Sequence, residues 1–216
     1  LYSHRVLGIV VCSHIGETME HLDSNCPLIS FEREIAENIP AVLCDNYQGG
    51  ILAADRLIDA GCRNIAIFNQ PTKENIPAYS REKAFLKCCE DKKISGRVVY
   101  TDRLAPLSEE FGNNILELLK KNSDLDGIFA TSDVMAANII RACKKMGKRV
   151  PEDISIVGFD DTWISTLTYP SITTIHQPVR EMCEYAIEAI VKKVKSEKVP
   201  SQVVFPVELI DRESTK

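Results

Sequence analysis

Residues 148–161 read KRVPEDISIVGFDD. The centre of this stretch, residues 154–159, is an almost continuous apolar run, which is typical of a parallel β-strand covered on both faces. Asp160 and Asp161 follow the run directly. Ligands bind beyond the carboxyl ends of the strands in an open parallel sheet. The stretch therefore predicts a buried strand with a polar site at its end.

The same pattern recurs along the chain, because short apolar runs alternate with segments of helical period. We predict strands over residues 7–12, 27–31, 41–44, 64–68, 98–100, 127–131, 154–159 and 173–175. We predict helices over residues 50–60, 80–92, 108–121, 133–146 and 179–195. This alternation indicates an α/β fold with parallel sheets and right-handed crossovers.

Polar side chains follow six of the predicted strands: Ser30, Glu32 and Arg33; Asp45 and Asn46; Asn69 and Gln70; Ser132 and Asp133; Asp160 and Asp161; His176 and Gln177. Together they predict a cleft for a polar, mostly uncharged small molecule such as a polyol. The alternative for each single residue is a helix cap or a turn, where Asp, Asn and Ser are favoured for local reasons.

Composition argues against nucleic acid and membrane as direct partners. The 26 Lys and Arg residues against 31 Asp and Glu residues give a net charge of −5, whereas phosphate backbones are bound by basic surfaces. No apolar run approaches the length of a membrane span, and no signal-peptide pattern is present. The 8 cysteines include no CxxC motif, and Cys12, Cys44, Cys143 and Cys183 lie in apolar runs or on apolar helix faces. This usage favours a reducing, cytoplasmic compartment.

Motifs of common enzyme classes are missing from the sequence. It contains no GxSxG elbow, no GxxxxGK[ST] phosphate loop and no HExxH metal motif. Gly49 and Gly50 look like part of a dinucleotide loop, but no third glycine follows at the required spacing. Asp160 and Asp161 offer hard oxygen ligands for Mg²⁺, so a metal-dependent doubly wound enzyme remains one alternative.

Several segments, taken in order, resemble the effector-binding core of the lactose/galactose-repressor family of bacterial transcription regulators. They are DNYQGGILAADRLIDAGCRNIAIF (45–68), FATSDVMAANIIRACKKMG (129–147), KRVPEDISIVGFDD (148–161), PSITTIHQP (170–178) and PVELIDREST (206–215). The resemblance implies two doubly wound α/β subdomains of the periplasmic-binding-protein-like type I fold. The effector would lie between them, and the chain would cross three times.

The resemblance also implies how the chain is divided. LYSHRVLGIVV at the start matches a later strand of the family, so we expect the first subdomain to be incomplete at its N-terminus. We also expect the DNA-binding helix-turn-helix to be absent, so operator DNA would be contacted only through that missing head. Residues 1–44 and 179–199 would form the remnant first subdomain, and residues 45–178 and 200–216 the second. The hinge would comprise Asp45, Asn46, Gln177, Pro178 and the turn at 199–201.

Effector-binding residues carry over by position in the matching motifs. Arg81 matches an arginine whose planar fork can donate to two adjacent sugar hydroxyls. Asp160 matches an acidic residue that accepts from vicinal hydroxyls. Ser132 would contact the ligand while Asp133 caps the following helix. Glu32 stands where many relatives carry Asp.

Apolar and cationic candidates complete the expected site. Trp163 could cover the C–H face of a sugar or pack between subunits. Leu107 and Phe111 fall near the family's aromatic wall, with Phe111 expected to face the core. A sugar phosphate would need a second cation, for which Lys73 and Arg33 are candidates.

The hypothesis from sequence is therefore the effector-binding and dimerisation domain of a sugar-responsive repressor. It would be a homodimer without a cofactor, and not an enzyme. Its alternative in the same fold is a periplasmic sugar-binding protein of a transporter. The cysteines and the PVELIDREST ending argue against that alternative.

Overall fold

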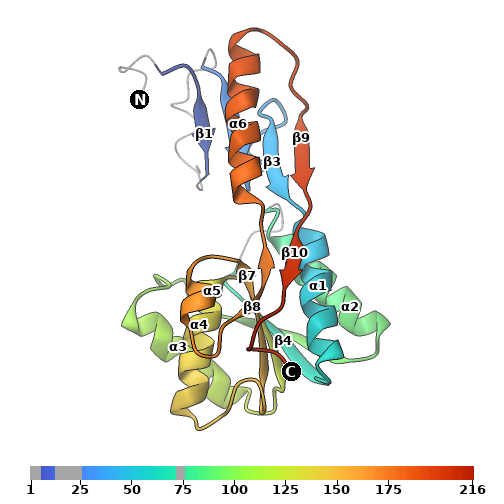
Figure 1. Cartoon of the computed structure of the whole chain (residues 1–216), viewed down its shortest axis with the longest axis vertical. Coiled ribbons are helices and arrows are strands. Elements are labelled where there is room, and N and C mark those ends of the chain that lie inside the picture. Colours follow the sequence, from blue (N-terminus) through green and yellow to red (C-terminus); the bar gives the residue numbers. More distant parts are fainter. Residues whose placement is uncertain (1–5, 13–25, 72–75) are drawn as a thin grey trace.

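Two β-sheets lie one above the other along the long axis of the computed structural model and are joined by chain crossings (Figure 1). The structure describes residues 6–12, 26–71 and 76–216. Lys73 lies outside these residues. No described helix has the length and apolar character needed to cross a bilayer.

The smaller subdomain is a four-stranded parallel sheet in the order β1-β2-β3-β9. Its strands are β1 (Ile9–Val11), β2 (Leu28–Phe31), β3 (Ala41–Cys44) and β9 (Gln202–Phe205). Helix α6 (Val179–Val194) packs on one face, where Met182, Ala186 and Ala189 join a buried cluster with Ile29 and Val42. Among the residues that the structure describes, α6 therefore covers one face of this sheet, and β1 and β9 are its outermost strands.

The larger subdomain is a six-stranded sheet in the order β10-β8-β7-β6-β4-β5, in which only the pairing of β10 with β8 is antiparallel. Its strands are β4 (Asn64–Asn69), β5 (Ser95–Tyr100), β6 (Gly127–Ala130), β7 (Ser155–Asp160), β8 (Thr173–His176) and β10 (Glu208–Ile210). Its helices are α1 (Asn46–Asp59), α2 (Tyr79–Asp91), α3 (Glu109–Lys121), α4 (Asp133–Lys145) and α5 (Ile164–Leu167).

Both faces of the larger sheet are covered, as the continuous apolar runs predicted. Ile65 and Ile67 of β4 pack in a cluster with side chains of α1 and α2. Ala66 and Phe68, which alternate with them, pack in a second cluster with α3 and α4. Because successive strand residues point to opposite faces, a strand between two helical layers must be apolar at every position.

The third chain crossing differs from the predicted one. Residues 200–216 were assigned to the second subdomain, but β9 pairs with β3 in the smaller sheet from Ala41 and Gln202 to Cys44 and Phe205. The crossing therefore lies at residues 206–207, between β9 and β10. The other crossings lie between β3 and α1 and between β8 and α6 (Figure 1).

The paired glycines Gly49 and Gly50 lie inside α1, which begins earlier than predicted. Asp45 caps this helix by accepting from the backbone N–H of Gln48 at 2.8 Å. A Cβ at Gly49 would come within 2.7 Å of the Phe159 ring, and a Cβ at Gly50 would clash with the backbone of Arg81. The glycines therefore permit close packing of α1 on β7 and α2, and they form no phosphate loop.

The eight cysteines are all free thiols, but they do not share one environment. Cys44 and Cys143 are buried, as expected of small apolar side chains. Cys12 and Cys183 are exposed, although the sequence places them in an apolar run and on an apolar helix face. Both belong to the smaller subdomain, in which Cys12 directly follows β1 and Cys183 lies in α6.

Candidate functional site

The carboxyl ends of both parallel sheets point to the junction between the subdomains. Glu32 follows β2 and Asn46 opens α1 just after β3 on the smaller side. Thr131 and Asp160 lie at the ends of β6 and β7 on the larger side, and Gln177 follows β8. The topology alone therefore brings polar side chains from five strand ends to one level of the molecule.

Arg81 is held on three sides at the start of α2. Its Nε donates to Asn46 Oδ1 at 2.6 Å, and its Nη1 donates to the carbonyl of Thr131 at 3.1 Å. Its guanidinium carbon lies 3.4 Å from the centre of the Phe159 ring. The side chain is only 7% exposed, so its orientation is set before any ligand arrives.

Asn46 connects Arg81 to the smaller subdomain. Its Nδ2 donates to Glu32 Oε2 at 3.2 Å, while Glu32 Oε1 accepts from the backbone N–H of Cys44. Glu32 has a positive φ of 53°, which turns the chain at the end of β2. Asn46 was predicted as a hinge residue and as one of the polar side chains at the strand ends, and in the structure it links the two candidate ligand groups Glu32 and Arg81.

Asp160 ends β7 with a positive φ of 105° and faces Gln177, another predicted hinge residue. Gln177 Nε2 donates to Asp160 Oδ1 at 2.6 Å. Desolvation raises the pKa of Asp160 to about 6, and the positive charge of Arg81 opposes this rise. Among the described residues, Oδ2 accepts no hydrogen bond and no ion pair joins Asp160 to Arg81. One carboxylate oxygen is therefore available to a ligand.

Ser132, and not Asp133 as predicted, caps α4. Ser132 has an extended backbone and caps α4, because its hydroxyl accepts from the N–H of Met135 at 3.2 Å. Asp133 is fully buried and accepts from Thr174 Oγ1 at 2.6 Å and from the N–H and hydroxyl of Thr162. An extended backbone is what a cap requires, and it directs the next side chain inward. Asp133 is thus a structural residue.

The carboxylate of Asp133 also explains a small residue in GFDD. A Cβ at Gly158 would come within 2.5 Å of Asp133 Oδ1. Burial raises the pKa of Asp133, and the hydrogen bonds from Thr174 and Thr162 oppose this rise. The buried group is satisfied by these donors, so it holds α4, β8 and the turn after β7 together.

Trp163 and Leu107 do not join the group around Arg81. Trp163 is 72% exposed before α5, and Leu107 is 85% exposed in the loop before α3. Phe111 is fully buried in the core, on the inner face of α3. Arg33 directly follows Glu32 and is partly buried. The aromatic surface found at the site is Phe159, which lay inside a predicted strand and was not identified.

Asp161 and Asp160 face different partners. Asp161 Oδ1 accepts from Arg212 at 2.6 Å, and Oδ2 lies 3.0 Å from His176 Nδ1. Burial alone would raise the pKa of Asp161, but the hydrogen bonds and charges of Arg212 and His176 lower it. Both oxygens of Asp161 are therefore occupied, which argues against the two carboxylates sharing one metal ion.

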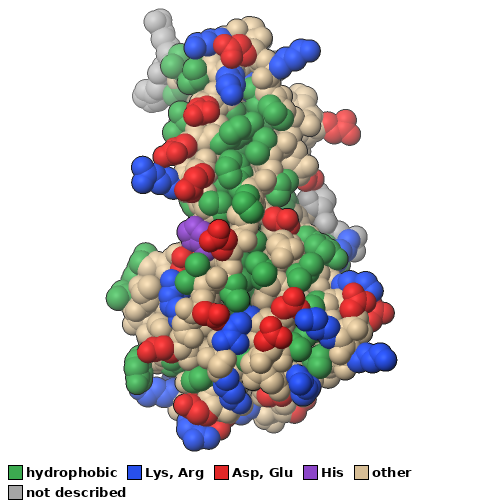
Figure 2. All heavy atoms as spheres, turned by 45° about the vertical axis from the view of Figure 1, so that its right-hand side comes forward, with side chains coloured by type: hydrophobic (Ala, Val, Ile, Leu, Met, Phe, Trp, Pro, Cys, Tyr) green, Lys and Arg blue, Asp and Glu red, His purple; other side chains and the backbone are tan. Residues whose placement is uncertain are grey.

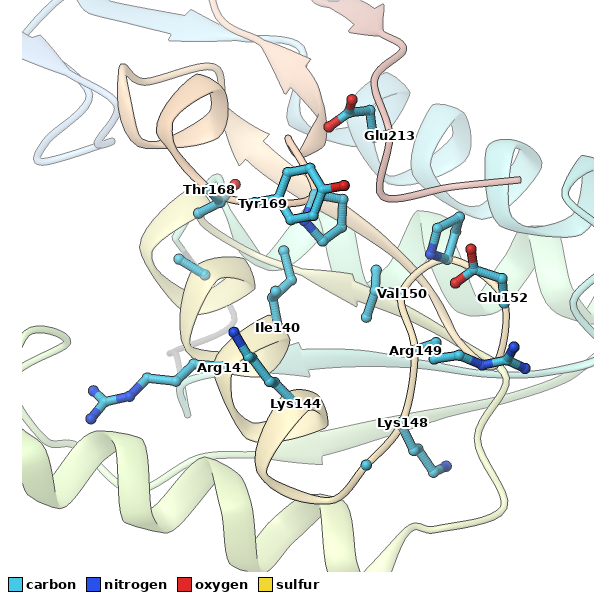
Figure 3. A pocket seen from close by; sticks show the side chains of 14 residues that line it. Ile140, Arg141, Lys144, Lys148, Arg149, Val150, Glu152, Thr168, Tyr169 and Glu213 are labelled. Carbon is cyan, nitrogen blue, oxygen red and sulfur yellow. The ribbon is translucent and has the colours of Figure 1, made fainter.

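A hollow with a volume of about 850 Å³ lies in the larger subdomain. It is enclosed by the last turns of α4, the loop at 147–152 and the segment at 168–170 (Figure 3). Lys144 and Arg149 line it together with Val150 and Tyr169, and Arg149 pairs with Asp153. Acidic and basic side chains are interspersed over the face of this subdomain that Figure 2 shows. A face with mixed charges is better suited to contact another protein than to bind the phosphate backbone of a nucleic acid.

Comparison with known proteins gives one family. Residues 54–215 match the periplasmic binding protein-like domain. The ribose operon repressor of Halalkalibacterium halodurans is 31% identical over 210 residues, which cover 97% of this chain and 62% of that protein. This chain therefore spans less than two thirds of the length of that relative.

Solved structures agree on the fold. A periplasmic binding protein/LacI transcriptional regulator from Alkaliphilus metalliredigens, complexed with D-xylulofuranose, is 33% identical with a TM-score of 0.84. The similarity covers 99% of this chain and 79% of that one. A LacI family regulator from Enterococcus faecium with bound ribose is 26% identical with a TM-score of 0.84, covering 99% of this chain and 81% of that one.

Proposed function

The chain belongs to the family of periplasmic binding protein-like domains, and on this premise we propose that it is the effector-binding and dimerisation domain of a sugar-responsive transcriptional repressor. One observation carries the proposal: Glu32, Asn46 and Arg81 form a hydrogen-bonded chain at the subdomain junction, beside Asp160 with its available oxygen. The arrangement offers a ligand both hydrogen-bond donors, on Arg81, and a hydrogen-bond acceptor, on Asp160.

The chemistry of these groups fits a small sugar. The Arg81 fork can donate to adjacent hydroxyls, and the Asp160 carboxylate can accept from a vicinal pair. The guanidinium lies over the ring of Phe159, which adds a cation–π contact to the hydrogen bonds that hold it. The relatives named above include a ribose operon repressor and regulators holding D-xylulofuranose or ribose, which supports a five-carbon sugar.

Ligand binding would act through the hinge. Three crossings join the subdomains, and Asn46 and Gln177 at two of them hydrogen-bond to the candidate ligand groups. A sugar that contacts both subdomains stabilises one relative orientation, which is a population shift. In a dimeric cytoplasmic repressor, that orientation would set the spacing of the DNA-binding heads.

We infer that the dimer forms in part through α5 and the segment after it. Trp163, Leu167 and Tyr169 are 72%, 72% and 92% exposed, and they lie within seven residues of one another. Large apolar side chains gathered on a surface mark protein interfaces. Analytical ultracentrifugation should show a dimer that Leu167→Lys with Tyr169→Lys converts to a monomer. A monomer in the unsubstituted protein would favour a transporter's binding protein.

A thermal-shift screen of pentoses, hexoses, disaccharides and their phosphates tests the ligand class. A sugar at 100 times its Kd adds roughly 2.7 kcal/mol to the free energy of unfolding, which is a rise in Tm of about 5–10 °C. The rise should persist in excess EDTA, whereas a metal-dependent enzyme would lose it. No shift with any sugar would refute the proposal.

A further inference from the structure

Two exposed cysteines of the smaller subdomain lie on facing surfaces of β1 and α6. Cys12 directly follows β1, and Cys183 lies in the second turn of α6. The two elements run side by side in opposite directions (Figure 1). Neither cysteine takes part in the candidate sugar site.

The sheet register shows which side chains of β1 point toward α6. Val10 pairs with Ile29, which packs in one cluster with Met182, Ala186 and Ala189 of α6. Alternate residues of a strand share a face, so Gly8, Val10 and Cys12 all point toward α6. For Gly8 this is shown directly, because a Cβ there would come within 2.5 Å of the Ile190 side chain.

The face of α6 toward β1 follows from helical spacing. Cys183 precedes Ile190 by seven residues, which is close to two turns, so the two side chains point the same way. The opposite flank of the helix carries Tyr185, whose ring packs edge-on against Phe205 of the other edge strand. Cys183 therefore lies on the β1 side of the helix.

The two cysteines also lie at the same height. Starting from the contact between Gly8 and Ile190, four residues along β1 advance about 13 Å to Cys12. Seven residues back along α6 cover about 10 Å in the same direction to Cys183. The pKa of Cys12 is raised, first by desolvation and then by the negative charge of the Cys183 thiolate, as expected of neighbouring thiols.

We propose that Cys12 and Cys183 form a reversible disulfide when the protein meets a hydroperoxide. One thiol ionises, and its thiolate attacks a peroxide oxygen; the O–O bond breaks, the sulfur becomes a sulfenic acid, and the departing hydroxide or alkoxide takes up the proton released by the thiol. The second thiol ionises in turn, and its thiolate attacks the sulfenic sulfur; the S–O bond breaks, the S–S bond forms, and the departing hydroxide takes up the second thiol's proton as water. Two thiols are oxidised and one hydroperoxide is reduced. The bond ties β1, whose partner among the described strands is β2, to the helix that packs on this sheet.

Peptide mapping of the whole chain under non-reducing conditions tests the pair. After treatment with hydrogen peroxide, we expect a peptide joining Cys12 to Cys183, with the intact mass lower by two hydrogens and restored by dithiothreitol. The disulfide should raise Tm by roughly 10 °C, because it closes a loop of more than 100 residues.

Single serine variants sharpen the test. Cys12→Ser and Cys183→Ser are exposed positions, so both proteins should fold and both should lose the joined peptide and the rise in Tm. Cys26→Ser, at a partly buried thiol outside the pair, should keep both. Separate oxidation of the two cysteines, or a disulfide between two chains in place of the internal one, overturns the proposal. The result does not depend on whether a sugar binds.

Discussion

Replacing Asp160 by Asn should stabilise the ligand-free protein at neutral pH. Its pKa is about 6 in the folded protein, against about 3.9 in an unfolded chain. The pKa difference is about two units, and each unit corresponds to about 1.4 kcal/mol. Ionisation of Asp160 therefore lowers the free energy of unfolding by up to about 3 kcal/mol. Because folding raises the pKa of Asp160, its contribution to the free energy of unfolding is fully present below pH 4 and is lost as the pH rises through about 6. Asn keeps an oxygen for Gln177 and removes the charge.

Urea unfolding at pH 7 and pH 4 measures this difference. We expect Asp160→Asn to gain about 1–3 kcal/mol at pH 7 and nothing at pH 4. The neighbouring variant Asp161→Asn is the matched control, because the pKa of Asp161 is lowered by Arg212 and His176. That variant should lose stability at pH 7. If Asp160→Asn is the less stable protein at pH 7, or if its gain persists at pH 4, the reasoning about the desolvated carboxylate is wrong.

Three further predictions concern the site and its supports. Calorimetric titration should show that Arg81→Ala weakens sugar binding by about 2–5 kcal/mol. Arg81→Lys should not restore it, because Lys lacks the planar fork that can reach Asn46 and the ligand together. An unchanged Kd in both variants would place the ligand elsewhere. Titrations at pH 5 and pH 7 should show weaker binding at pH 5, since protonation of Asp160 removes an acceptor; equal affinity would exclude it from the site. Ser132→Ala should cost about 1 kcal/mol of stability and leave the Kd unchanged, whereas a ligand-contacting Ser132 would do the reverse.

The layers of the larger subdomain were predictable because its strands are buried on both faces. The run from Ile65 to Phe68 is apolar at every position, and each position reaches a covered face. The short strands β9 and β10 were missed for the opposite reason. In β9, Gln202 and Val204 are exposed, so the segment shows neither a continuous run nor a long alternation. The third crossing was misplaced as a result.

The sequence predicted that the candidate site lies at the strand ends, but it did not predict the role of every residue there. Arg81 and Asp160 were identified through their motifs, and the topology brings them to one junction. Ser132 and Asp133 are both good caps, and only the backbone angles decide between them. Phe159 lies in an apolar run that is buried on both faces, and such a run does not reveal which ring lies beneath the arginine.

The aromatic rings that pack beneath Arg81 bear on which residues of the site are free to change. Phe159 stacks near Phe129, which stacks near Phe85, and Phe85 lies one turn from Arg81 on the same helix. The arginine is thus braced by a closed ring of contacts within the larger subdomain. Glu32 comes from the other subdomain and is held by only a backbone N–H and one amide. If the sugar binds as proposed, new sugar preferences would therefore arise by exchange of residues on the smaller side, while Arg81 keeps its position.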